Sequence, residues 1–110
     1  MLKLLSREPD KNDYAKIRLS NGKFAKVDKE SYNWLNAYYW RAKLSHSCYY
    51  AARRKITNGK ATTILMHREI TQCPKNMVVH HRNHDTLDNR SENLVNVYQN
   101  KHYEIHNSIA

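Results

Sequence analysis

The chain has 110 residues, of which 40% are apolar and 26% are charged, and its formal net charge is +9. This composition is typical of one globular domain and argues against a disordered chain. The first residues lack the apolar run of a signal peptide, and no stretch is long enough to cross a membrane. Cys48 and Cys73 have no CxxC spacing, so neither a disulfide framework nor a zinc ribbon is indicated. We therefore expect a cytoplasmic protein in a reducing environment, with no membrane partner.

The positive charge is concentrated in the first part of the chain. Residues 1–65 contain 14 Lys and Arg against 5 Asp and Glu, whereas residues 66–110 contain five of each. Lys and Arg that contact phosphates release condensed counterions, so a basic region favours a polyanionic partner, most simply nucleic acid. The alternative is a soluble basic protein without such a partner.

The first part begins with a predicted hairpin and a helix. Residues 14–28 alternate apolar with basic side chains around Asn21-Gly22, a dipeptide that favours a tight turn. Asp28 is placed to N-cap a helix over residues 29–39, in which Trp34 and Tyr38 share a face. The largest aromatic side chains are expected to fill the core: Phe24, Trp34 and Trp40.

Three further strands are predicted, at residues 39–44, 48–55 and 61–66. On the middle strand Tyr50 and Arg54 share one face, whereas Arg53 lies on the other. One face should pack on the helix, and the other would present a Tyr and an Arg to DNA, with the Arg on a phosphate or a base edge. The sequence does not decide which face is which, and a solvated edge strand is the alternative.

The second part of the chain is predicted to run helix, strand, loop, strand, helix. The segment MHREI should form a short helix that ends before Pro74. The segments NMVVHH and NLVNVY are expected to form two strands on either side of a polar loop, and residues 99–110 have helical spacing. In that loop we expect Asp85 and Asp88 to bond to nearby backbone groups.

Five of the seven histidines lie between residues 80 and 106, which points to a metal site. His102 and His106 are four residues apart on the predicted last helix, so both imidazoles face the same side. The strand end with His80 and His81 is the obvious source of a third ligand. Three imidazoles leave positions open for water and substrate, as in a catalytic rather than a structural site. Taken singly, each histidine pair is a weak signal and more often a surface coincidence.

The segments VVHH, LDNRSENL and HYEIH resemble the HNH, or ββα-metal, nuclease motif. With FAKVD, Trp40 and YYAARR upstream, the chain resembles phage and intron-encoded HNH endonucleases, including homing endonucleases. Asn93 precedes His102 by nine residues and His106 by thirteen. In this spacing, and in its His-His pair, the chain is similar to the colicin DNases.

The resemblance implies a role for each of these positions. His80, His102 and His106 would hold one divalent metal ion, His81 would be the general base, and Asn93 would fix the loop that presents it. Hydrolysis would leave a 5′-phosphate and a 3′-hydroxyl. Relatives usually carry Asp where this chain has His80, and an all-imidazole set suits Zn, Mn, Ni or Co better than Mg.

The sequence therefore predicts an α+β endonuclease of duplex DNA, in a bacterial cell and consistent with a phage-encoded protein. Residues 1–65 would form a basic sheet-and-helix region and residues 66–110 the ββα-metal motif, within one compact unit. The expected DNA contacts come from both regions: Tyr50, Arg53, Arg54, Arg82 and Arg90. His67 is expected to be structural. The sequence leaves open a monomer or a homodimer, a DNA-binding regulator with a structural zinc, and a protein that cleaves or binds RNA.

Overall fold

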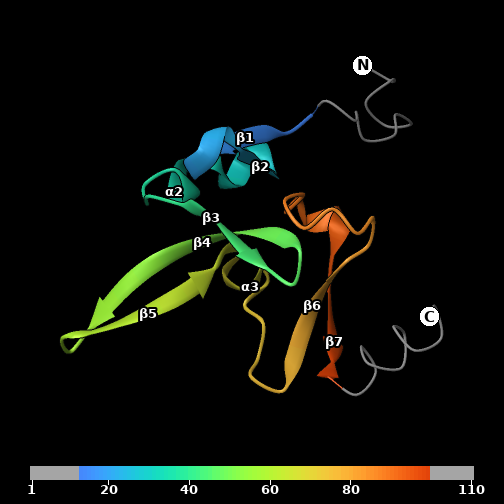
Figure 1. Ribbon diagram of the computed structural model, residues 1–110. Helices are drawn as coiled ribbons and strands as arrows, with labels where there is room; N and C mark the ends of the chain where they lie inside the picture. The colour runs from blue at the N-terminus through green and yellow to red at the C-terminus, as the bar shows by residue number, and fades with distance from the viewer. Residues whose placement is uncertain (1–12, 100–110) are drawn as a thin grey trace, which may run out of the picture.

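The computed structural model describes residues 13–99, which form three small antiparallel sheets with short helices between them (Figure 1). The protein is therefore an α+β protein, as predicted. The first sheet is the predicted hairpin: β1 (Ala15–Arg18) pairs with β2 (Phe24–Val27). Between them the 3-10 turn η1 (Ser20–Gly22) has positive φ at Asn21 and Gly22, 62° and 72°, which is the conformation that this dipeptide was expected to supply.

The predicted helix over residues 29–39 is much shorter than expected. A 3-10 turn, η2 (Lys29–Ser31), leads into a single helical turn, α2 (Tyr32–Leu35). The indole Nε1 of Trp40 donates a hydrogen bond to the Leu35 carbonyl oxygen at 2.7 Å. The Trp40 side chain thus takes the Leu35 carbonyl, which in a longer helix would accept a backbone N–H from the next turn. The helix therefore ends at Leu35.

Asp28 does not cap this helix through its side chain, contrary to the prediction. Its carboxylate instead accepts a hydrogen bond from the backbone N–H of Ser91 at 3.2 Å, and a second from the Ser91 hydroxyl. Asp28 therefore joins the first part of the chain to the segment before the last described strand.

The second sheet has the order β3–β4–β5, so the first part of the chain forms two sheets rather than the one expected. Its strands are β3 (Arg41–Ser45), β4 (Cys48–Thr57) and β5 (Lys60–Leu65). The long β4 pairs with β3 through its first half and with β5 through its second half. The β4–β5 hairpin consequently extends beyond β3 and projects from the body of the molecule (Figure 1).

The second part of the chain follows the predicted order of elements over its described residues. They are α3 (Met66–Thr71), β6 (Met77–His81), the 3-10 turn η3 (Ser91–Asn93) and β7 (Leu94–Tyr98). Strands β6 and β7 form the third sheet, in a register that pairs His80 with Val95 and His81 with Leu94. The predicted last helix lies outside the described residues.

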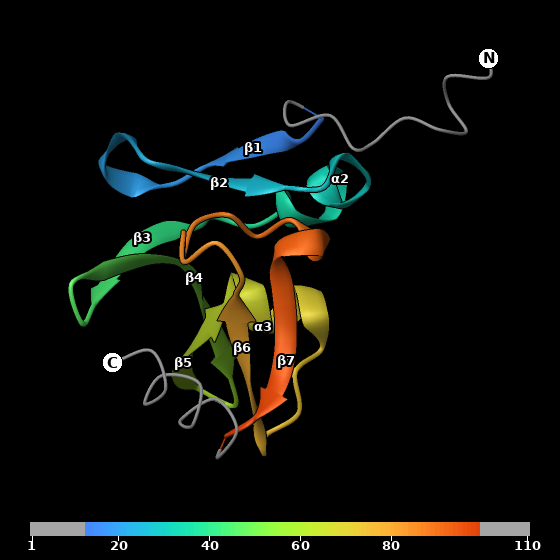
Figure 2. The same ribbon diagram turned by 90° about the vertical axis from the view of Figure 1, so that its right-hand side faces the viewer.

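The core lies between the β1–β2 sheet and the β3–β4 strands, and α2 and the start of α3 also contribute to it (Figure 2). Its buried members are Ile17, Leu19, Ala25, Val27, Leu35, Trp40, Ala51 and Met66. Trp40 is buried as predicted, but Phe24 and Trp34 are 40% and 41% exposed, so their assignment to the core was wrong. Alternation explains Phe24: Ala25 and Val27 occupy the inner face of β2, and Phe24 lies on the outer face beneath Lys16.

The loop between β6 and β7 docks against β2 through an isolated parallel β-bridge between Lys26 and Asp88. The Lys26 N–H donates to the Leu87 carbonyl at 2.9 Å, and the Asn89 N–H donates to the Lys26 carbonyl at 2.8 Å. Regions 1–65 and 66–110 are thus in direct contact at this loop. Over residues 13–99, no helix is long and apolar enough to span a membrane.

Candidate active site

A cleft of about 490 Å³ lies between the β3–β4–β5 sheet and the β6 strand with its following loop. Tyr50 and Leu65 form part of the sheet side, and Val78 and Val79 part of the β6 side. Four histidines contribute to its lining: His67, His80, His81 and His84. A largely apolar concavity with a few convergent titratable groups is the arrangement expected of an active site.

His81 ends β6 and is 6% exposed. Its Nε2 lies 2.9 Å from the carboxamide Oδ1 of Asn89, and its ring centroid lies 5.1 Å from that of His67. Burial lowers the pKa of His81, against the opposing effect of the Asn89 hydrogen bond. The imidazole is therefore neutral near pH 7, the protonation state that a general base requires.

His67, for which we expected only a structural role, packs directly against His81. It lies on α3, is 7% exposed, and its ring centroid is 5.6 Å from that of Tyr50. Burial lowers the pKa of His67 to about 3, and the neighbouring His81 and Arg68 act in the same direction. Burial also raises the pKa of Tyr50. One wall of the cleft therefore places two neutral rings against His81.

His80 and His81 line the same cleft although they are neighbours on a strand. Alternation on β6 would send their side chains to opposite faces. However, β6 ends at His81, and the chain turns so that His84, with a φ of 65°, returns toward the strand. The ring centroids of His80 and His84 are 5.6 Å apart and their planes are nearly perpendicular. The turn thus brings a third imidazole to the cleft beside the doublet.

Asp88 organises the loop after β6 from its interior. Its side chain is 1% exposed and accepts hydrogen bonds from Arg90 at 2.7 and 2.8 Å and from the Asn83 amide at 2.9 Å. Burial would raise the pKa of Asp88, but these hydrogen bonds outweigh it and the pKa is lowered. Asp85 bonds the Leu87 N–H at 3.1 Å. Asp88 Oδ1 also accepts a hydrogen bond from the Arg90 backbone N–H at 3.3 Å, so both aspartates make the expected bonds to nearby backbone groups.

Asn93 joins the two ends of the same loop. Its Oδ1 accepts a hydrogen bond from the Asn83 N–H at 3.0 Å, and its Nδ2 donates to the Asp88 carbonyl at 2.8 Å. Its backbone carbonyl accepts from the Arg82 N–H at 2.8 Å. Asn93 is 5% exposed, so these bonds are shielded from water. These hydrogen bonds connect the start of the loop that follows His81 to its end.

Asn89 is a site residue that the sequence reasoning missed. Its backbone N–H is bonded to Lys26 of β2, and its side chain contacts His81. The position of the Asn89 side chain beside His81 therefore depends on the docking of the loop on β2. The segment LDNR contained it, but an Asn in a polar loop gives no sign of which side chain it will meet. Only the pairing of this loop with β2 reveals the contact.

Arg53 does not have the position of a DNA contact, which corrects its assignment. It is 8% exposed, and its guanidinium bonds both carboxylate oxygens of Glu69 at 2.8 and 3.2 Å. The guanidinium also lies 3.8 Å above the centre of the Tyr38 ring. The odd-numbered face of β4 packs inward at this point, and therefore the charge of Arg53 is neutralised within the protein.

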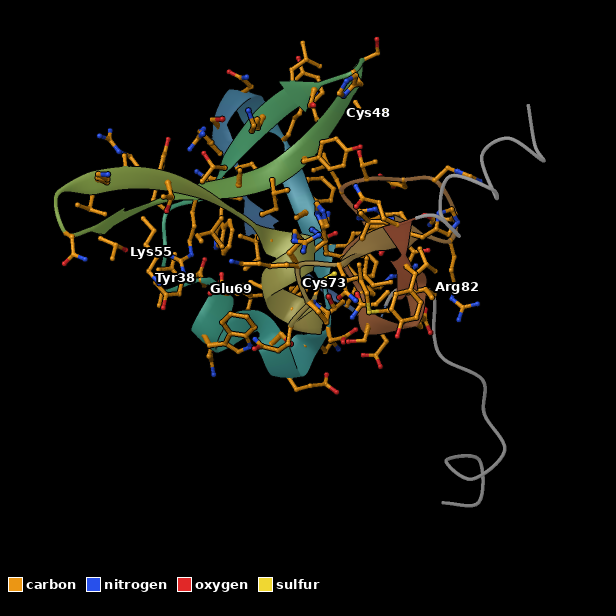
Figure 3. All side chains as sticks on the ribbon, turned by 90° about the horizontal axis from the view of Figure 1, so that it is seen from below. Tyr38, Cys48, Lys55, Glu69, Cys73 and Arg82 are labelled. Carbon is orange, nitrogen blue, oxygen red and sulfur yellow. The ribbon has the colours of Figure 1, made fainter. Side chains whose placement is uncertain are left out.

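The other predicted DNA contacts differ in accessibility. Arg90 is engaged by Asp88 and by Glu92, the latter at 3.0 Å, so it acts within the loop rather than as an open phosphate clamp. Arg54 and Arg82 are exposed, and Tyr50 lines the cleft. Figure 3 shows Arg82 at the outer side of the β6–β7 unit and Glu69 on α3 at the centre of the molecule.

The predicted metal ligands are only partly within the described residues. His80 lies at the cleft, whereas His102 and His106 lie outside residues 13–99. Within residues 13–99, no three His, Cys, Asp or Glu side chains form a cluster able to hold a metal ion. The His80 imidazole is a chemically suitable ligand for a divalent transition metal. The other ligands of such a metal would have to come from outside residues 13–99.

Comparison with known proteins supports the assignment of this region. A family model described as HNH endonuclease matches residues 70–102, from within α3 to His102. The match includes the His80–His81 doublet and Asn93, and it ends before His106. Searches of curated proteins and of solved structures gave no match. Residues 70–102 are thus similar to the HNH endonuclease family.

Proposed function

We propose that this protein is a metal-dependent endonuclease that hydrolyses phosphodiester bonds of duplex DNA. The observation that carries the proposal is the placement of His81. It is a buried neutral imidazole, oriented by Asn89, in a cleft that His80 also lines and within the segment that matches the HNH family. The excess of Lys and Arg in residues 1–65 supports a polyanionic substrate.

His81 would act as the general base. A carboxamide oxygen accepts but cannot donate, so with Asn89 Oδ1 as its partner the Nε2 atom would carry the ring proton, and Nδ1 would keep the free electron pair. We propose that Nδ1 takes a proton from a water molecule as the water oxygen bonds to phosphorus. The bond from phosphorus to the 3′-oxygen then breaks, and that oxygen gains a proton from solvent. The products are a 5′-phosphate and a 3′-hydroxyl.

Asn89 and Asn93 would serve as positioning residues. Asn89 fixes the His81 tautomer and ring direction, because a rotated imidazole would lose the 2.9 Å contact. Asn93 holds the loop that carries Asn89, through its bonds to Asn83 and to the Asp88 carbonyl. A base that is already oriented pays little reorganisation energy in the transition state.

His80, His102 and His106 would hold one divalent ion. When bound, such an ion would neutralise charge on the phosphoryl group and on the leaving oxygen. Three imidazoles favour Zn, Mn, Ni or Co over Mg, which prefers oxygen ligands. Among these three ligands, His80 lies within the described residues, at the cleft.

The proposal is tested by incubating supercoiled plasmid with the purified protein and a panel of divalent metal ions, with a chelator control. We expect conversion to the open-circular or linear form with at least one transition metal, and no conversion with the chelator. A DNA-binding regulator with a structural zinc would retard the plasmid without nicking it in any metal. Cleavage of single-stranded RNA but not of plasmid would reassign the substrate to RNA.

A further inference from the structure

The face of the β3–β4–β5 sheet that lines the cleft carries a row of cations. On β4 the side chains of Tyr50, Ala52 and Arg54 alternate onto one face. Their cross-strand partners share that face: Lys43 lies opposite Tyr50, and Arg41 lies opposite Ala52. Because Lys43 and Tyr50 line the cleft, this face forms the sheet side of the cleft, and His81 lies on the β6 side. We call Arg41, Lys43 and Arg54 the cationic row.

The charge of this sheet is not balanced within it. Residues 41–65 contain six Lys and Arg and no Asp or Glu. Arg53, on the opposite face, is paired with Glu69 from α3, whereas Arg54 and Lys43 are exposed and Arg41 is partly exposed. Arg41 and Arg54 also line one shallow groove together with Thr63. The row is thus an accessible cationic surface that leads out of the cleft.

The dimensions of the row fit the backbone of a duplex. Tyr50, whose ring centroid is 6.4 Å from that of His81, marks the cleft end. Arg54 lies four positions along β4 from Tyr50, about 13 Å at roughly 3.3 Å per position. This length corresponds to about four base pairs of B-DNA at roughly 3.4 Å each. A projecting two-stranded ribbon such as β4–β5 is also narrow enough to follow a DNA groove.

We propose that the cationic row binds the phosphates that flank the scissile bond of duplex DNA and thereby seats that bond in the cleft. The inference rests on the proposed function and adds the residues and the sheet face that hold the substrate. Strand alternation and the β4–β5 register place Lys55 and Lys60 on the opposite face of the same hairpin, which would make little contact with the duplex. Figure 3 shows Lys55 on the projecting part of the hairpin and Cys48 at the other end of β4.

Two double variants with equal loss of charge test the proposal. They are Arg41→Gln with Arg54→Gln on the cleft face, and Lys55→Gln with Lys60→Gln on the opposite face. Binding of each to a short labelled duplex of mixed sequence is measured by fluorescence anisotropy over a range of salt concentrations, in a His81→Ala background that prevents cleavage. All four substituted side chains are partly or fully exposed, and thermal melting checks that both variants fold.

The cleft-face variant should lower the slope of log affinity against log salt by about 2, since each lost phosphate contact removes roughly 0.9. Its affinity at about 0.1 M salt should fall on the order of 10- to 100-fold. The opposite-face variant should lose less than about 3-fold. Equal losses in the two variants, a larger loss in the opposite-face variant, or no loss in either would overturn the proposal.

The two proposals can fail separately. If the wild-type protein cleaves plasmid but the cleft-face variant binds the duplex like its parent, the cationic row is wrong and the nuclease proposal stands. If the wild-type protein cleaves no nucleic acid yet the cleft-face variant alone loses affinity, the row stands and the nuclease proposal fails.

Discussion

The packing of His67 against His81 predicts a measurable dependence of stability on pH. The pKa of His67 is lowered from 6.5 to about 3, first by burial, so the native protein leaves this imidazole neutral where the unfolded chain protonates it. Between those two values the unfolded state binds one proton more. Stability is therefore fully present above pH 6.5 and is lost as the pH falls toward 3.

The size of the effect follows from linkage. Each pH unit in this window is worth about 1.4 kcal/mol for one proton, and about pH 5 lies roughly 1.5 units below the unfolded pKa. His67 should therefore cost about 2 kcal/mol of unfolding free energy between about pH 7.5 and about pH 5. The value does not depend on the native pKa so long as that pKa stays below 5.

The assay compares wild type with His67→Phe, which keeps a ring against Tyr50 and His81 but cannot titrate. Urea unfolding is followed at both pH values, in the presence of a chelator so that metal binding does not contribute. The other histidines are common to both proteins, and their effects cancel in the double difference. We expect the wild type to lose about 2 kcal/mol more than the variant. Equal losses in the two proteins would refute a buried, neutral His67.

Two further predictions concern the loop and the metal. Asn93→Ala removes two shielded side-chain hydrogen bonds. Urea unfolding should show that the variant loses roughly 2–4 kcal/mol of unfolding free energy. A loss below about 0.5 kcal/mol would show that the stability of the loop does not depend on these bonds. His102→Ala and His106→Ala should each weaken divalent metal binding in isothermal titration calorimetry, and unchanged affinity in both variants would dismiss them as ligands.

The strands were predicted well, because alternating side chains and turn dipeptides mark each of them in the local sequence. The Asn21-Gly22 dipeptide and the alternation around it specified the first hairpin, and Pro74 marked the end of α3. The predicted length of the 29–39 helix was wrong because the Trp40 indole hydrogen-bonds a carbonyl of the last helical turn, and the helix ends there. That contact depends on the tertiary position of Trp40, which helical spacing does not encode.

The candidate site could be predicted only in part, because several of its contacts also depend on tertiary structure. The His80–His81 doublet and Asn93 stood out as residue types at a recognisable spacing. The partners of His81 did not, because Asn89 reaches it through docking on β2 and His67 reaches it from α3. Arg53 and Arg54 are adjacent and identical in type, yet alternation buries one with Glu69 and leaves the other exposed. No property of the pair itself distinguishes them.

The central claim, that His81 is the general base, is tested most directly by one rate measurement. The single-turnover rate of plasmid nicking is compared for wild type, His81→Ala and His46→Asn, with the most active metal ion. His46 is exposed in the β3–β4 turn and has positive φ, which Asn tolerates, so this variant serves as the matched control.

We predict that His81→Ala lowers the rate by about 10²- to 10⁴-fold, the usual contribution of a general base, without loss of DNA or metal affinity. His46→Asn should nick at the wild-type rate. A His81→Ala protein that nicks as fast as wild type would contradict the account.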